Sequence, residues 1–197
     1  MERIVKAKFI TDFYGSAPAL GAQEVMKRYV EDKIDKAFLS FIDGIKKKGD
    51  TITDKAAEIL SVFHRDDNGY PVMGNWMLKK CLVTTGENSF NALKDKSHPK
   101  KQIVKNSIIY VEPMPHVNVY NGSIVKQPSG VRTYTVTVGN RSFFKAYEWI
   151  PKGTTFEFKV TYDETMLHEE HMELMLQRCG RFGVGAFRER FGKFELL

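Results

Sequence analysis

The chain has 197 residues, of which 42% are hydrophobic and 27% are charged. This composition suits a globular domain with a sizeable core, and no apolar run approaches the length of a membrane span. The two cysteines, Cys81 and Cys179, lie far apart in the sequence without metal-type spacing, which excludes a disulfide-rich scaffold and predicts two free structural thiols. The formal net charge of +6 favours an anionic partner.

The amino-terminal half predicts one strand followed by helices. Residues 3–12 alternate in polarity, which indicates a strand. Helices are expected at 22–45, where apolar residues recur every three or four positions, from Thr53 or Asp54 to Phe63, and at 75–83. A turn is expected at Asp66–Gly69.

The carboxy-terminal half turns to strands after a polar, lysine-rich stretch at 87–105, which lacks periodicity and predicts an exposed insertion. Strands are expected at 107–111, 117–120, 132–138, 143–149, 154–162 and 191–196, with a hairpin turn at Gly139-Asn140. Asp163 is expected to cap a helix that runs from Glu164 to about Gln177.

Without insertions, the order of these elements is β-α-β-β-α-β. This order predicts an α+β fold with a ferredoxin-like (RRM-like) core, in which an antiparallel sheet carries its helices on one face. We expect a single domain over residues 1–197, with insertions at about 50–70 and 87–149, the second one rich in strands.

The last eighteen residues, Gly180 to Leu197, interleave glycines, basic residues and phenylalanines. Glycine allows close backbone approach, arginine donates a forked pair of hydrogen bonds to phosphate, and aromatic rings stack on bases. The basic residues of the segment are Arg181, Arg188, Arg190 and Lys193. A second basic stretch lies at 94–105. These features suit a nucleic-acid-binding surface, although a glycine loop that leads into an ordinary core strand, beside a solvated charged face, also fits them.

Three segments together carry a family resemblance: Pro71-Val-Met-Gly74 before a helix, Ile150-Pro-Lys-Gly-Thr-Thr-Phe-Glu-Phe158, and Gly183-Val-Gly-Ala-Phe-Arg-Glu-Arg-Phe-Gly-Lys-Phe-Glu195. With them the chain resembles the repeat-associated mysterious protein (RAMP) superfamily of CRISPR-associated RNA-binding proteins. The resemblance covers 71–80 and the chain from about residue 143. A phage or mobile-element relative with the same fold fits equally well. Thr11-Asp-Phe-Tyr-Gly15, after the first strand, does not clearly match a cleavage loop.

The resemblance implies a ferredoxin-like core and a site at the glycine-rich loop. There Gly183 and Gly185 would approach RNA phosphates, and Arg188 and Arg190 would neutralise them, with Arg181 in the same basic segment. From the neighbouring helix, contacts are implied for Lys79 and Lys80, with Met73 and Gly74. Phe191 and Phe194 are expected in the core.

Catalytic and metal signals are weak. His168 and His171 are spaced i, i+3 rather than the i, i+4 of a zinc helix, and a solvated helix face fits them best. His64 and His116 are candidate acid–base groups. We found no motif for a nucleotide, a nicotinamide or a catalytic metal, so we expect neither cofactor nor metal.

These observations favour a non-enzymatic protein that binds RNA or single-stranded nucleic acid, as a subunit of a ribonucleoprotein or other multi-subunit assembly. One alternative is a metal-independent endoribonuclease of the same fold that uses His64 or His116. Another is a phage structural or inhibitor protein that binds a host protein complex. Because the first residues show no apolar signal core, we expect a cytoplasmic location in a bacterial, archaeal or infected host cell, without membrane contact.

Overall fold

The computed structural model describes residues 1–18, 60–92, 101–138, 141–186, 188 and 190–197. The chain forms two compact units where the sequence predicts one domain with insertions. The first contains Met1–Phe13, Arg65–Lys126 and Pro151–Leu197, and the second contains Tyr14–His64 and Gln127–Ile150. The second unit thus combines parts of both expected insertions with residues that precede them.

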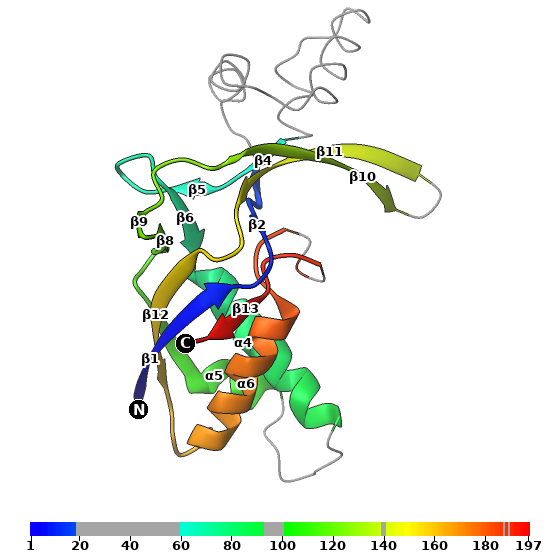
Figure 1. The fold of residues 1–197 in the computed structure, drawn as a ribbon. Helices are drawn as coiled ribbons and strands as arrows, with labels where there is room; N and C mark the ends of the chain where they lie inside the picture. Colours follow the sequence, from blue (N-terminus) through cyan, green and yellow to red (C-terminus); the bar gives the residue numbers. More distant parts are fainter. Residues whose placement is uncertain (19–59, 93–100, 139–140, 187, 189) are drawn as a thin grey trace, which may run out of the picture. The chain divides into compact units, whose positions relative to one another are not determined.

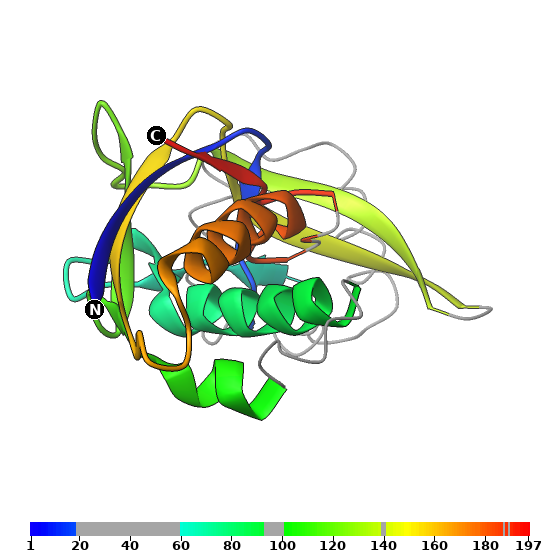
Figure 2. The same ribbon diagram turned by 90° about the horizontal axis from the view of Figure 1, so that it is seen from below.

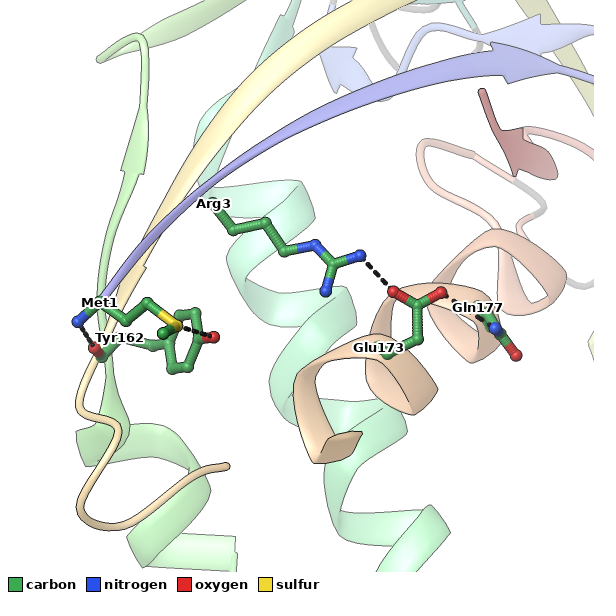
Figure 3. Close-up of polar contacts among 5 residues, drawn as sticks. All are labelled: Met1, Arg3, Tyr162, Glu173 and Gln177. Atoms are coloured by element: carbon green, nitrogen blue, oxygen red, sulfur yellow. Dashed lines mark hydrogen bonds and ion pairs between the residues drawn. The ribbon is translucent and has the colours of Figure 1, made fainter. Parts of the chain in front are cut away.

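The first unit is built on an antiparallel sheet in the order β13-β1-β12-β8-β6, and β7 also pairs with β12. Its strands are β1 (Glu2–Phe9), β6 (Pro71–Gly74), β7 (Ile108–Glu112), β8 (His116–Asn121), β9 (Ser123–Ile124), β12 (Thr155–Tyr162) and β13 (Phe194–Leu196). The central pair, β1 and β12, runs from Glu2 opposite Thr161 to Lys8 opposite Thr155. The amino group of Met1 extends this pairing by donating a hydrogen bond to the carbonyl of Tyr162 at 2.8 Å (Figure 3).

Helices cover one face of this sheet. They are α4 (Asn75–Ala92), α5 (Lys101–Ser107) and α6 (Glu169–Phe182), and Figures 1 and 2 show α4 and α6 lying side by side against the strands. Alternation in β1 and β12 turns Val5, Ala7, Phe9, Phe156, Phe158 and Val160 inward. They pack with the helix residues Leu78, Leu82, Met172, Met175 and Leu176 into one core.

The second unit, as far as it is described, is a smaller sheet in the order β10-β11-β4-β3. Its strands are β3 (Ala17–Pro18), β4 (Leu60–Val62), β10 (Gly130–Val138) and β11 (Arg141–Ile150). The β10–β11 pair is antiparallel along its whole length, whereas β11 and β4 are parallel. Two further strands, β2 (Phe13–Tyr14) and β5 (His64–Arg65), lie where the chain passes between the units. Both units therefore fit an α+β protein with mostly antiparallel strands.

Several predicted elements are confirmed, because β1, β7, β8, β10, β11, β12 and β13 all overlap expected strands. The turn at 66–69 is also present, since the Asp66 carboxylate accepts hydrogen bonds from the backbone amides of Asn68 and Tyr70 at 3.0 and 2.8 Å. The expected helix at 22–45 and the turn at Gly139-Asn140 lie outside the described residues.

Three predictions about helices need correction. Residues 60–62, expected at the end of a helix, form strand β4; their buried–intermediate–buried pattern shows period-two packing. The helix that starts at residue 75 continues to Ala92, and α5 occupies part of the stretch expected to be irregular. The last helix begins at Glu169 rather than Glu164, because the Asp163 carboxylate binds Thr165 and holds a turn before the helix.

Candidate nucleic-acid interface

The glycine-rich segment is a closed loop between α6 and β13. Gly183 ends α6 with a φ of 86°, and its amide donates to the carbonyl of Cys179 at 2.9 Å. Val184, only 2% exposed, donates from its amide to the carbonyl of Gly192 at 3.0 Å, and the Gly192 amide in turn donates to the carbonyl of Asp12 at 2.8 Å. The loop is therefore held by its own main chain.

Two of its glycines are required by close packing inside the loop. A Cβ on Gly183 would lie 2.6 Å from the carbonyl oxygen of Phe191 and 2.7 Å from that of Arg188. A Cβ on Gly192 would lie 1.9 Å from the carbonyl oxygen of Val184. Gly183 is buried, and the atoms nearest to it belong to the backbone of this loop. Gly185, with a φ of 82°, is half-buried and lies nearer the surface.

The end of β1 fastens the loop from the other side. The amide of Ile10 donates to the carbonyl of Lys193 at 2.9 Å, and the amide of Lys193 donates to the Thr11 hydroxyl at 2.9 Å. The carboxylate of Asp12 accepts a hydrogen bond from the amide of Lys152 at 3.0 Å. Asp12 therefore ties neighbouring turns together, and this contact gives it a structural role.

The arginines of the segment lie on the outside of this framework. Arg190 and Arg181 are exposed, and Arg188 is half-buried with its guanidinium carbon 5.4 Å from the centre of the Phe182 ring. Such a cation–π contact restricts the guanidinium plane while its N–H groups stay able to bind an anion. Phe194 is buried at 3% exposure, as expected, and Phe191 is half-buried.

Helix α4 brings its amino-terminal end towards this loop. The thiol of Cys81 faces the carbonyl oxygens of Cys179 and Gly183 at 3.5 and 3.6 Å, and the Thr85 hydroxyl, one turn later, donates to the carbonyl of Met175 at 3.3 Å. The two helices are therefore antiparallel. The start of α4 consequently lies at the same end of the first unit as the glycine loop.

The two lysines of α4 differ in their placement. Lys79 donates from its ammonium group to the carbonyl of Ile109 in β7 at 3.0 Å. Because each helical residue advances the direction by ~100°, Lys79 points about 200° away from Cys81 and thus away from the glycine loop. Lys80 is exposed. Met73 is buried in the core. The residues for which the resemblance implies RNA contacts here, Met73, Gly74, Lys79 and Lys80, therefore do not all face one ligand.

Sequence reasoning missed Trp76, which is 44% exposed in the first turn of α4. A Cβ on Gly74 would lie 2.4 Å from its indole ring, so the ring rests directly on the backbone of this buried glycine. The ring centre of His116 lies 5.9 Å from that of Trp76. Of the two candidate acid–base histidines, His116 thus lies in the first unit, whereas His64 belongs to the second unit. The sequence does contain a signal for Trp76: it stands two residues after Gly74, which ends a strand, and the helical period turns this position outward.

The face of the sheet opposite the helices carries paired charges. The ammonium group of Lys6 lies 3.5 Å from the Glu157 carboxylate, and that of Lys159 lies 3.3 Å from Glu2 and 2.6 Å from Glu112. Strands β1 and β12 place no aromatic ring on this face, since Phe156 and Phe158 point into the core. These two central strands therefore lack the exposed rings with which RRM-type sheets stack bases.

An open groove of about 510 Å³ lies along the first half of α6. Its lining residues are Arg3, Glu169, Glu170, Glu173, Leu174 and Gln177. Arg3 forms an ion pair with Glu173, whose other oxygen accepts a hydrogen bond from Gln177 at 3.0 Å (Figure 3). Three carboxylates against one guanidinium disfavour a polyanion here. Along α6 the charge thus changes from acidic at its start to basic at Arg178 and Arg181.

Neither a protein-family model nor a curated protein sequence matches the chain. Among the residues that the structure describes, no helix is long and apolar enough to span a membrane. Within the same residues, no group of three or more histidine, cysteine, aspartate or glutamate side chains is arranged to hold a metal ion.

Proposed function

We propose that this protein binds RNA or another single-stranded nucleic acid at the glycine loop between α6 and β13, without cleaving it, as a subunit of a larger assembly. The observation that carries the proposal is the combination of a loop fixed by its main chain with Arg181, Arg188 and Arg190 on its outer side. A fixed loop binds without losing much conformational entropy, so the guanidinium groups are presented to phosphates at low cost.

A ferredoxin-like core is the finer fold that we propose for the first unit. With β13, β1, β12 and β7 taken as the fourth, first, third and second strands, the order β13-β1-β12-β7 is the 4-1-3-2 order of two interlocked split β-α-β units. In chain order α4 lies between the first and second of these strands, after the inserted strands β2 to β6, and α6 lies between the third and fourth. This agreement supports the RAMP resemblance and a loop that, by that resemblance, contacts RNA.

The charge distribution of the first unit supports the same end as the contact surface. Acidic side chains line the groove at the start of α6, and the open sheet face is occupied by lysine–glutamate pairs. Arginines gather at the end of α6 and in the loop that follows. A polyanion is attracted to a region of positive potential. We therefore expect it to contact the described part of this unit at the end that carries the glycine loop.

The test is to replace Arg188 and Arg190 with alanine and to measure binding of a labelled single-stranded RNA at several salt concentrations. We expect affinity to fall at least tenfold, which corresponds to about 1.4 kcal/mol. The slope of log affinity against log salt should also decrease by about 0.7 for each lost phosphate contact on a single strand.

A matched control removes two positive charges elsewhere, by Lys6→Ala together with Lys126→Ala. Lys6 lies on the open sheet face beside Glu157, and Lys126 is exposed near the Tyr70 ring. We expect this control to change affinity far less than the arginine pair does. Equal losses in the two double variants would show a general charge effect and would contradict a site at the glycine loop.

A further inference from the structure

The chain contains the dipeptide Asn-Gly twice, at Asn68-Gly69 and at Asn121-Gly122, and both pairs lie in the first unit. All four residues are exposed. The two glycines have φ values of 77° and 73°, and nothing lies within 4 Å of the place where a Cβ would stand on either of them. The two pairs therefore match in sequence, in exposure and in the φ of their glycine.

The second pair forms the reversal between β8 and β9. Asn121 pairs with Ser123, so Gly122 alone makes the turn, with a positive φ that favours glycine. Within the described part of the chain, the amide of Gly122 donates no hydrogen bond to another residue. This N–H group is therefore open to solvent, and its nitrogen directly follows the Asn121 side chain in the sequence.

The first pair differs in its hydrogen bonds. The amide of Gly69 donates to the main-chain carbonyl of Asp66 at 2.9 Å. The Asp66 carboxylate accepts from the amides of Asn68 and Tyr70 at 3.0 and 2.8 Å. Three successive amides are thus fixed on one residue. The Gly69 nitrogen consequently has to give up a hydrogen bond before it can turn towards the Asn68 side chain.

We propose that Asn121 is a site of spontaneous deamidation, a covalent modification that needs no reagent except water. The Gly122 nitrogen attacks the Cγ carbonyl of Asn121, so that an N–Cγ bond forms and the Cγ–Nδ2 bond breaks. The proton of the Gly122 amide leaves with the side-chain nitrogen as ammonia. Water then opens the resulting succinimide ring. Its addition at Cγ gives aspartate, and its addition at the main-chain carbonyl carbon gives isoaspartate, in which the main chain runs through Cγ.

Glycine is the residue that best permits this ring closure, because it carries no side chain to shield its nitrogen or to restrict its backbone. The product matters for β8 and β9. Isoaspartate lengthens the main chain inside a turn that a single residue makes, so the pairing behind the turn should weaken. There the amide of Val125 donates to the carbonyl of Val119 at 2.9 Å. Either product also adds one negative charge to a chain whose formal net charge is +6.

Ageing of the folded protein at mildly alkaline pH tests the site, because base removes the amide proton of Gly122. Peptide mapping by mass spectrometry locates each conversion of amide to acid, and fragmentation separates isoaspartate from aspartate. We expect Asn121 to convert several-fold faster than Asn68. In concentrated urea, where both turns are lost, the two rates should approach each other. In the aged folded protein, hydrogen exchange of the Val125 amide should become faster.

Two variants separate the chemistry from its structural cause. Asn121→Gln keeps a side-chain amide but has to close a larger ring, so the acidic product that cation exchange separates early should disappear. Asp66→Ala removes the carboxylate that holds the other turn, so Asn68 should then convert faster.

Equal rates at Asn121 and Asn68 in the folded protein overturn the proposal, as does an acidic product that forms just as fast in Asn121→Gln. An unchanged rate at Asn68 in Asp66→Ala would contradict the role of the hydrogen bonds. All of these measurements are made without RNA, so their outcome is independent of the site proposed at the glycine loop.

Discussion

Cys81 and Cys179 show how much a single contact depends on the fold. The two residues are far apart in the sequence, yet the thiol of Cys81 lies 3.5 Å from the carbonyl oxygen of Cys179, and both side chains are buried between α4 and α6. Burial raises the pKa of the Cys179 thiol well above its usual range, and the neighbouring Cys81 raises it further. Both thiols are therefore free and part of the core of the first unit.

This environment predicts a loss of stability at alkaline pH. Above the ordinary thiol pKa near 9, the unfolded chain releases the Cys179 proton, whereas the folded protein keeps it. The unfolded state then binds fewer protons, so the free energy of unfolding falls as pH rises, by at most ~1.4 kcal/mol per pH unit for one thiol. Below that pKa both states hold the proton, and the effect of this group vanishes.

Comparison with Cys179→Ala isolates the effect of this thiol from the other groups that titrate in the same range. We expect the unaltered protein to be the more stable at neutral pH, because its sulfur fills the helix interface. The stability difference between the two proteins, measured by urea unfolding, should shrink towards about pH 10. A difference that stays constant with pH would show that the thiol titrates alike in both states.

Tyr14 adds a second alkaline-sensitive group, in the second unit. Burial and a hydrogen bond of 2.6 Å with Tyr134 raise the pKa of its hydroxyl, and the Arg132 guanidinium, which donates to Tyr14 at 3.0 Å, partly opposes this. Because the pKa of Tyr14 is raised in the folded protein, its contribution to stability is complete below the ordinary tyrosine pKa. That contribution is lost as pH rises from there towards the pKa in the folded protein.

At the scale of elements, the α6–β13 loop depends on glycines for more than backbone freedom. Gly192→Ala should destabilise the protein strongly, because it combines a φ of 66° with a Cβ that would lie 1.9 Å from the carbonyl oxygen of Val184. Gly153→Ala is the matched control. Its φ of 92° is equally unfavourable for alanine, but nothing lies within 4 Å of the added methyl group.

We therefore expect about 1 to 2 kcal/mol of destabilisation from Gly153→Ala, the cost of the backbone conformation alone. Gly192→Ala should cost several kcal/mol, since the clash is with backbone rather than with a mobile side chain. Urea unfolding of the two variants measures both values. Similar losses in the two proteins would mean that the loop relaxes around the methyl group, and that its closed shape is not fixed as described.

The elements that could be predicted are those whose sequence period matches a single packing face. Strands β1 and β12 alternate cleanly because one face packs under α4 and α6 and the other carries Lys6, Glu157 and Lys159 in solvent. That alternation is visible without a structure. The glycine loop was recognisable for a related reason, since the clustering of glycine and arginine is local in the sequence.

The errors came from residues whose role depends on distant partners. The core face of α4 continues through Thr85 and Gly86, whose small or polar side chains hide the helical period. They are buried because Met175 and Val104 pack against them. Likewise, the spacing of Ile59, Leu60 and Phe63 in the sequence fits a helix. The pairing of Leu60 and Ser61 with β11 instead places residues 60–62 in a strand.

The residues of the site divide in the same way, into those visible in the local sequence and those placed by distant contacts. Arg188 and Arg190 could be selected from local composition, but the opposite directions of Lys79 and Cys81 follow from contacts with Ile109 and Cys179. The position of the Trp76 ring depends on a backbone glycine beneath it. Such three-dimensional support has no signature beyond two residues, Gly74 and Trp76, that stand close together in the sequence.

At the scale of the whole molecule, the chain passes between its two compact units four times. Two of these crossings fall inside strands, within β2 between Phe13 and Tyr14 and within β5 between His64 and Arg65. Boundaries between independent domains normally fall in exposed linkers. Since β2 and β5 each begin in one unit and end in the other, unfolding of one unit should disturb the end of a strand that belongs to the other.

We therefore predict that the two units unfold together. Each unit contains one of the two tryptophans, Trp76 in the first and Trp149 in the second. The Trp149→Phe and Trp76→Phe variants thus report separately on the two units. Their urea-unfolding curves should share one midpoint, after correction for the small effect of each substitution on stability, and that midpoint should match the loss of circular dichroism, as in a two-state transition. A midpoint for Trp149 well below that for Trp76, found both on unfolding and on refolding, would contradict this prediction. It would show that the second unit opens on its own while the glycine loop and its arginines remain folded.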